Sequence, residues 1–100
     1  MKPVSKVEII IDALEVEHVT KFLDEIGVSG YSIINDVVGK GHRGMRSGDA
    51  LTDLFKNSYI MIVCEEKEMH KIVEAVRPIV KKFGGVCIVS DVIMRIHKNT

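Results

Sequence analysis

The stretch that decides the fold is Val7-Glu8-Ile9-Ile10-Ile11, in which every residue but Glu8 is β-branched. Such residues are stiff at the first side-chain torsion and pack well on a pleated surface. The stretch therefore predicts a short strand near the centre of a sheet.

Two further segments of the chain have apolar residues spaced with the period of a helix. The first stripe has the i, i+3, i+4, i+7 spacing and consists of Val19, Phe22, Leu23 and Ile26. It predicts a helix from about Glu15 to a left-handed stop at Gly27. A second helix is predicted from Glu65 to Phe83, with a kink or a fresh helical start at Pro78.

Three further segments have strand composition, at residues 31–38, 58–64 and 86–90. The last is expected to continue, bent or bulged near Asp91, as far as Ile96. The order is then βαββαβ, and right-handed crossovers place both helices on one face of a four-stranded antiparallel sheet with strand order 4-1-3-2. We therefore expect an α+β, ferredoxin-like fold in a single domain spanning residues 1–100.

The other face of this sheet has no local element to cover it. The strands are apolar at nearly every position and do not alternate, as in a sheet buried on both faces. Self-association is the simplest cover. In the predicted order, strand one separates Cys64 from Cys87, so an internal disulfide is not expected.

Composition excludes several classes of protein. The chain has 100 residues and a formal net charge of zero, so no global basic field attracts nucleic acid. No apolar run approaches the ~20 residues of a membrane-spanning helix, and the N-terminus does not read as a signal peptide. The two cysteines lie in apolar runs, which favours a reducing, cytoplasmic location.

The segment between the second and third strands, Gly39 to Phe55, is far longer than the ~2 to 5 residues of ordinary hairpin loops. Its first half interleaves glycines with cations, and the residues of interest are Gly39, Lys40, Gly41, Arg43 and Arg46. Free backbone amides and arginine donors suit a phosphate or carboxylate ligand. The alternative is a solvated loop whose glycines merely keep it flexible.

Two other places offer anion-binding groups. Gly84 and Gly85 give permissive backbone before the last strand, which could face a neighbouring subunit, although an ordinary helix C-cap explains them as well. Arg95 and His97 share one face of the predicted last strand and could complete an anion site, or could form a solvated strand end.

Catalysis and metal binding lack a supporting pattern. The histidines at positions 18, 42, 70 and 97 do not have the short spacing of metal ligands. No pair of carboxylates and no activated nucleophile stands out. The sequence predicts neither an enzyme nor a metal site.

Taken together, several features resemble the PII signalling family. They are the βαββαβ order, the run from Gly27 to Ser32 entering strand two, Gly39-Lys40-Gly41 opening a long loop, and the arginine in the last strand. The resemblance implies a homotrimer with inward-facing sheets, nucleotide sites in the clefts between subunits, and a loop that engages a target, often a membrane transporter. With the loop cations, it assigns to the nucleotide or anion site Ser32, Gly39, Lys40, Gly41, Arg43, Arg46, Gly84, Gly85, Arg95 and His97.

The departures from that family are informative. The long loop has no tyrosine, the glutamine after the loop-base glycines is missing, and the phosphate loop is reduced to two glycines. The pattern is similar to divergent PII-like proteins associated with bicarbonate transport and carboxysomes. This similarity implies ADP, AMP or cyclic AMP as ligand, with bicarbonate as a further candidate. The alternatives are a trimeric divalent-metal tolerance protein or cation-efflux regulator, with His42 as a ligand, and a module whose loop binds protein only.

Overall fold

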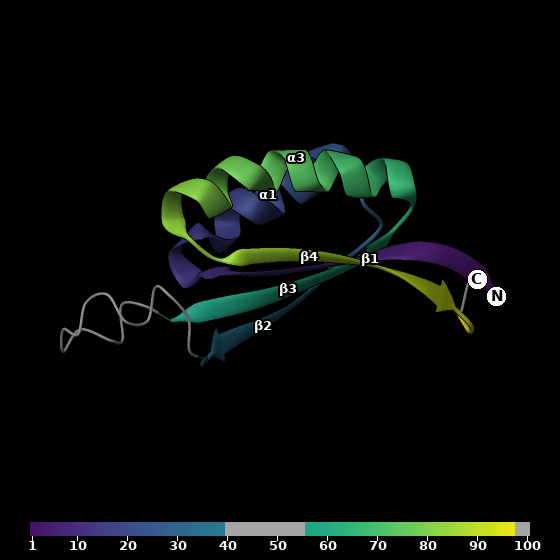
Figure 1. Ribbon diagram of the computed structural model, residues 1–100, viewed down its shortest axis with the longest axis horizontal. Coiled ribbons are helices and arrows are strands. Elements are labelled where there is room, and N and C mark those ends of the chain that lie inside the picture. Colours follow the sequence, from purple (N-terminus) through teal and green to yellow (C-terminus); the bar gives the residue numbers. More distant parts are fainter. Residues whose placement is uncertain (40–55, 98–100) are drawn as a thin grey trace.

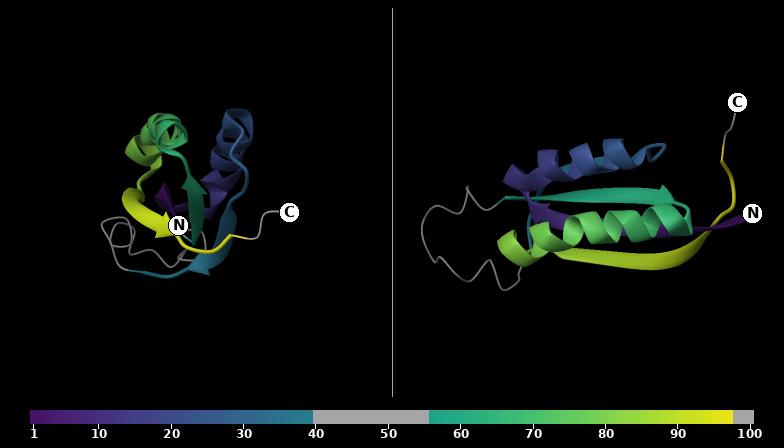
Figure 2. Two further views of the ribbon diagram at one scale, coloured as in Figure 1. Left: turned by 90° about the vertical axis from the view of Figure 1, so that its right-hand side faces the viewer. Right: turned by 90° about the horizontal axis from the view of Figure 1, so that it is seen from above.

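The computed structural model describes residues 1–39 and 56–97. Its elements are β1 (Lys2–Asp12), a 3-10 turn η1 (Ala13–Glu15), α1 (Val16–Ile26), β2 (Ser32–Val37), β3 (Asn57–Cys64), α3 (Glu66–Phe83) and β4 (Val86–Met94). The strands form one antiparallel sheet in the order β2-β3-β1-β4, and both helices lie on one of its faces (Figures 1 and 2). This is the predicted order read from the other edge, so the ferredoxin-like prediction is confirmed.

The core lies between the helices and the two central strands. On β1, Val7, Ile9 and Ile11 are fully buried and alternate with partly exposed residues, as the period of two requires. The other fully buried aliphatic side chains of the core are Ile60 and Ile62 of β3, Val19 and Leu23 of α1, and Ile72 and Val76 of α3. Burial of each stabilises the fold by roughly 1.5–3 kcal/mol relative to exposure.

β1 is central but not short, so that part of the prediction is wrong. It has 11 residues and pairs with β4 from Lys2 opposite Met94 to Ile10 opposite Val86. β3 joins β1 only from Ser5 onward. Pro3 therefore lies where β1 has one neighbour, a position that a residue without a backbone donor can occupy.

The irregularity of the sheet lies in β2 rather than in β4. The register between β1 and β4 changes by one residue at every step on both sides of Asp91, so a bulge there is excluded, although the strand is curved (Figure 2). In β2 the register shifts between Ile34 and Val37, and Asp36 has a positive φ of 60°. Aspartate tolerates this left-handed conformation better than most residues. β4 ends at Met94, so Arg95 and His97 follow the strand instead of lying within it.

α3 is one helix of 18 residues that continues through Pro78, so a fresh helical start there is excluded. Gly27 ends α1 in the left-handed conformation, with φ 87°, as predicted. None of the helices in the described part of the chain is long and apolar enough to cross a membrane.

A capping box begins α3. The Glu65 side chain accepts a hydrogen bond from the backbone of Glu68, and the Glu68 carboxylate accepts one from the Glu65 backbone N–H at 3.1 Å. Because these bonds satisfy amides that have no partner within the helix, we expect Glu68→Ala to lower the free energy of unfolding by about 1 kcal/mol. Glu66→Ala is the control, since it removes the same charge from the first turn without touching the box. Urea unfolding that gives equal losses for the two variants would contradict this role.

The face of the sheet opposite the helices is open (Figure 1). An apolar row crosses all four strands on this face, made up of Ile34, Tyr59, Ile10 and Val86. In the adjacent row Ile88 is 50% exposed and lies opposite Glu8, whose carboxylate accepts a hydrogen bond from the Tyr59 hydroxyl at 3.1 Å. Burial and the Glu8 carboxylate raise the pKa of Tyr59. The described part of the chain supplies nothing to cover this face.

Candidate functional site

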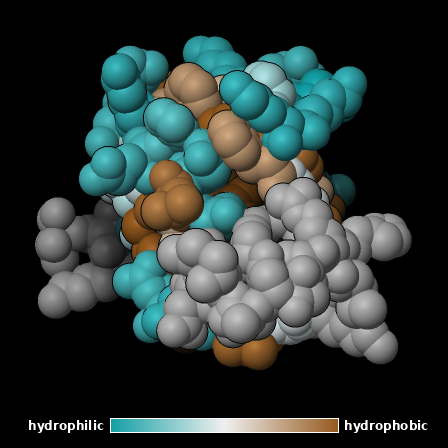
Figure 3. Space-filling model, turned by 90° about the vertical axis from the view of Figure 1, so that its left-hand side faces the viewer, coloured by the Kyte–Doolittle hydropathy of each residue, from teal (hydrophilic) through white to brown (hydrophobic). Residues whose placement is uncertain are grey.

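Two of the predicted site segments lie at the same end of the sheet. Gly84 and Gly85 precede β4, which starts opposite Ile10 near the end of β1. Gly39 follows β2, whose last residue lies opposite Asn57 at the start of β3. We call this the glycine end. Seen from it, the described surface alternates hydrophilic patches with exposed hydrophobic atoms (Figure 3).

Gly85 lets β4 begin in close contact with β1. Its φ is 118°, and a Cβ on this residue would lie 2.4 Å from the Ile10 carbonyl oxygen and 3.2 Å from the Ile11 side chain. No L-residue fits that space without moving the backbone. The Gly84 N–H donates to the Val80 carbonyl at 2.8 Å, so this pair of glycines does serve as the end of α3.

Arg95 and His97 lie at the opposite end of the sheet. They follow β4 beside Lys2, the residue paired with Met94, near the N-terminus (Figure 1). At a strand rise of ~3.3 Å per residue, the ten steps from Gly85 to Arg95 span about 33 Å. One copy of the chain therefore does not bring these two side chains to its own glycine end.

At this second end, which we call the arginine end, the residues line an open hollow of about 620 Å³. Its polar lining comprises Lys2, Ser29, Glu65, Glu68, Arg95 and His97. Lys2 is 3.4 Å from the Glu65 carboxylate, whereas Arg95 has no carboxylate within salt-bridge distance among the residues that the structure describes. The guanidinium of Arg95 is thus free to donate to an anion.

Of the other predicted residues, Ser32 starts β2 opposite Met61, exposed on the open face. Lys40, Gly41, Arg43 and Arg46 lie outside the described residues. Lys2 and Ser29 were missed by the sequence reasoning, since only the pairing of β1 with β4 brings the N-terminus beside Arg95.

Residues 1–39 and 56–97 contain no group of three histidine, cysteine, aspartate or glutamate side chains placed to hold a metal ion. His42 lies outside those ranges. Both thiols are free, and burial raises the pKa of Cys64 and of Cys87. Neither is therefore activated as a thiolate at neutral pH.

Two comparisons with known proteins, one with family models and one with solved structures, agree with each other. The model of the family "Nitrogen regulatory protein P-II" matches residues 4–98. The structure of CPII from Thiomonas intermedia K12 bound to ADP and bicarbonate is 31% identical, with a TM-score of 0.76, and the match covers 90% of this chain and 86% of that one. A second CPII structure, bound to ADP, AMP and bicarbonate, is 28% identical with a TM-score of 0.77, covering 95% and 97%.

A more distant relative shares the fold. A PII-like signaling protein from Thermus thermophilus is 22% identical, with a TM-score of 0.72, and the match covers 91% of this chain and 88% of that one. The arrangement of two helices on a four-stranded antiparallel sheet is thus common to this chain and all three structures.

Proposed function

This chain belongs to the nitrogen regulatory protein P-II family as a divergent, PII-like member, and we propose that it is a non-catalytic regulator that binds an adenine nucleotide between the subunits of a homotrimer. ADP and AMP, together with bicarbonate, are the proposed ligands, and cyclic AMP is the third nucleotide to test. The site is made by the glycine end of one subunit and the arginine end of the next.

The main support for this proposal is the distance between the glycine end and the arginine end within one chain. Gly39, Gly84 and Gly85 provide backbone for close approach of phosphates, and Arg95 and His97 provide side-chain donors, but within one chain these groups lie about 33 Å apart. A ring in which each copy contacts the next head to tail would join them at every interface. Three equivalent sites would then form from halves that no single subunit combines.

The open face of the sheet supports the ring. Its apolar row runs across all four strands and leaves Ile34 and Val86 exposed, and a contiguous apolar patch of this kind is typical of a contact surface. Three copies with this face turned inward would bury the row and leave the helices outside. The hydrogen-bonded Glu8 and Tyr59 would keep their partner in that setting, which lowers the cost of burying their polar atoms.

The identity of the ligand is supported by the two CPII structures, one bound to ADP and bicarbonate and the other to ADP, AMP and bicarbonate. In this chain we assign the nucleotide and anion to Ser32, Gly39, Lys40, Gly41, Arg43, Arg46, Gly84, Gly85, Arg95 and His97. Hydrophobic atoms exposed at the glycine end offer an apolar surface to a base (Figure 3).

We further propose that ligand binding changes the conformation of the segment from Gly39 to Phe55 and thereby changes the affinity of that segment for a membrane transporter. The glycines and cations of that segment support this role, because they allow it to respond to an anion at its base. The protein would act from the cytoplasm.

Calorimetric titration of the full-length protein tests the nucleotide. We expect saturable binding of ADP or AMP, tightened by bicarbonate, with no turnover of the nucleotide in the same sample. Sedimentation or light scattering should give a trimer. Absence of measurable binding of ADP, AMP and cyclic AMP, with and without bicarbonate, would overturn the proposal.

A further inference from the structure

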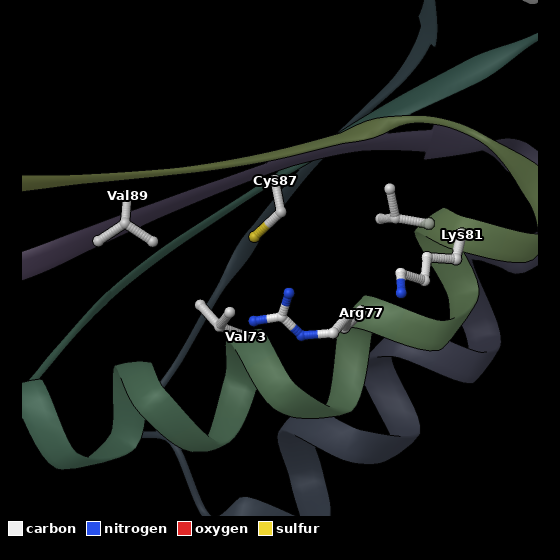
Figure 4. Close-up of a pocket in the computed structure, with 6 residues that line it drawn as sticks. Val73, Arg77, Lys81, Cys87 and Val89 are labelled. Carbon is white, nitrogen blue, oxygen red and sulfur yellow. The ribbon is translucent and has the colours of Figure 1, made fainter.

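A groove on the helix side of the sheet lies next to the glycine end but is lined by none of its glycines. It lies between α3 and the edge strand β4 and has a volume of about 270 Å³. Figure 4 shows the side chains that converge on it. Val73, Arg77, Val80 and Lys81 come from α3, and Cys87 and Val89 come from β4.

The walls of this α3–β4 groove are apolar. Three valines line it, and the Cys87 sulfur points into it toward the helix (Figure 4). Burial raises the pKa of Cys87 although Arg77 lowers it, so the thiol is neutral at physiological pH. A neutral thiol packs like a small apolar side chain. The groove thus offers hydrocarbon a place out of water.

The charge at the groove has one sign. Arg77 and Lys81 stand one helical turn apart on α3, and no carboxylate of the residues that the structure describes lines the groove. Arg77 contacts Glu74 at 3.1 Å through one of its terminal nitrogens, which leaves its other donors available. Among the described residues, Lys81 has no carboxylate within salt-bridge distance.

We propose that the α3–β4 groove binds an amphipathic monocarboxylate, an aliphatic chain of medium length that ends in a carboxylate. The chain lies along Val73, Val80 and Val89, and the carboxylate accepts hydrogen bonds from Arg77 and Lys81. Small-ligand sites are typically apolar clefts with a few polar groups that fix orientation, and 270 Å³ suits a ligand below drug size. Charge-assisted hydrogen bonds favour a carboxylate over a neutral head group.

This inference does not rest on the nucleotide proposal, because none of the groove residues is assigned to the nucleotide. The two can therefore fail separately. A protein that binds ADP and not the carboxylate, or the reverse, would distinguish them.

Octanoate, below its micellar concentration, is the probe. Calorimetry on the full-length protein should show saturable binding to the wild type, and we expect Lys81→Glu to weaken it at least about tenfold. Lys82→Glu is the matched control. It reverses the charge of the adjacent residue in the same last turn, but the Lys82 ammonium lies over the Phe83 ring, 5.2 Å from its centroid, and does not line the groove. Its affinity for octanoate should stay within about twofold of the wild type, a change below half a kcal/mol.

Two further ligands test separately the contributions of the aliphatic chain and of the charge on the head group. Octylammonium keeps the chain and reverses the head group, and acetate keeps the carboxylate without the chain, so neither should bind measurably at concentrations that saturate with octanoate. Equal weakening by the two lysine variants would show general electrostatics, and equal affinity for octylammonium would show binding through the hydrocarbon chain alone. Either result would overturn the proposal. Absence of saturable binding to the wild type would do the same.

A chemical readout keeps the test independent of any variant. In the wild type, octanoate should slow alkylation of Cys87 by N-ethylmaleimide, measured by peptide mass mapping, because the chain would cover the sulfur (Figure 4). Acetate should leave the rate unchanged. An alkylation rate at Cys87 that saturating octanoate does not alter would place the ligand elsewhere and overturn the assignment.

Discussion

Replacement of Gly85 by alanine is expected to lower the free energy of unfolding by about 3 kcal/mol. Two costs add. The φ of 118° is one that L side chains rarely adopt, and the new Cβ would lie 2.4 Å from the Ile10 carbonyl oxygen. A backbone oxygen in a central strand cannot swing away as the end of a flexible side chain can. For a domain of this size the melting temperature should fall by more than about 10 °C.

Two other glycines provide graded controls for that experiment. Gly27 also has a positive φ, 87°, but nothing lies within 4 Å of a Cβ placed there, so Gly27→Ala should lose only about 1 kcal/mol. Gly30 has open space and no positive φ, and Gly30→Ala should be neutral or slightly stabilising. Urea unfolding should show the largest loss of stability for Gly85→Ala, a smaller loss for Gly27→Ala and no loss for Gly30→Ala. Equal stability of Gly85→Ala and Gly30→Ala would mean that β4 does not begin against β1 as described.

The second large effect concerns nucleotide affinity. Removal of the donors at the arginine end, in the double variant Arg95→Ala with His97→Ala, should weaken ADP binding by about 10- to 100-fold, since a hydrogen bond to a charged group contributes roughly 1.5–3 kcal/mol. At the glycine end, Gly39→Glu places a carboxylate where the phosphates are proposed to lie. Gly39 is exposed, has no positive φ and has open space around it, so this variant should fold normally. Gly39→Ala adds a methyl group without a charge and should weaken ADP binding less than Gly39→Glu does.

Mixing these two defective proteins distinguishes a site between subunits from a site within one. In a head-to-tail ring, a site is intact wherever a subunit with an intact glycine end meets a neighbour with an intact arginine end. After random reassembly of equal amounts, about one site in four should regain wild-type affinity, as counted by calorimetric stoichiometry. If both halves of the site lay in one chain, mixing would restore nothing, and the proposed trimeric site would be wrong even if ADP binds.

The failures of the sequence-based predictions share one cause. The predicted first strand covers only Val7 to Ile11, whereas β1 extends from Lys2 to Asp12. The added residues Lys2, Pro3 and Ser5 have poor strand propensity. They are held in the sheet by pairing with β4, a segment more than 80 residues away in the chain. The predicted irregularity near Asp91 was a bend or a bulge, and the register shift lies instead between Ile34 and Val37, where Asp36 has a positive φ. Neither register is encoded in the neighbouring residues.

The candidate site also combines features that the sequence predicts with features that only the tertiary structure supplies. The glycines and cations could be recognised from their chemistry, and Gly85 does occupy a position that only glycine fits. Their separation to opposite ends of the sheet follows from the direction of β4, and the meeting of Lys2 and Ser29 with Arg95 follows from strand pairing. The α3–β4 groove could not be predicted from the sequence. Arg77 and Lys81 have the pattern of solvated helix residues, and only the tertiary structure places Cys87 and Val89 beside them.

The sequence by itself determined the type and order of the elements, the stop at Gly27, the side of each helix that is buried, and the presence of an apolar sheet face with no local cover. These features depend on periods of 2 and 3.6 residues and on single-residue backbone preferences, which act over a few neighbours. Only the tertiary structure decided how far β1 extends, where the sheet is irregular, which cations meet, and that a groove lies between α3 and β4. Those features depend on contacts between residues distant in the chain, and burial and backbone pairing over the whole sheet select one register among many.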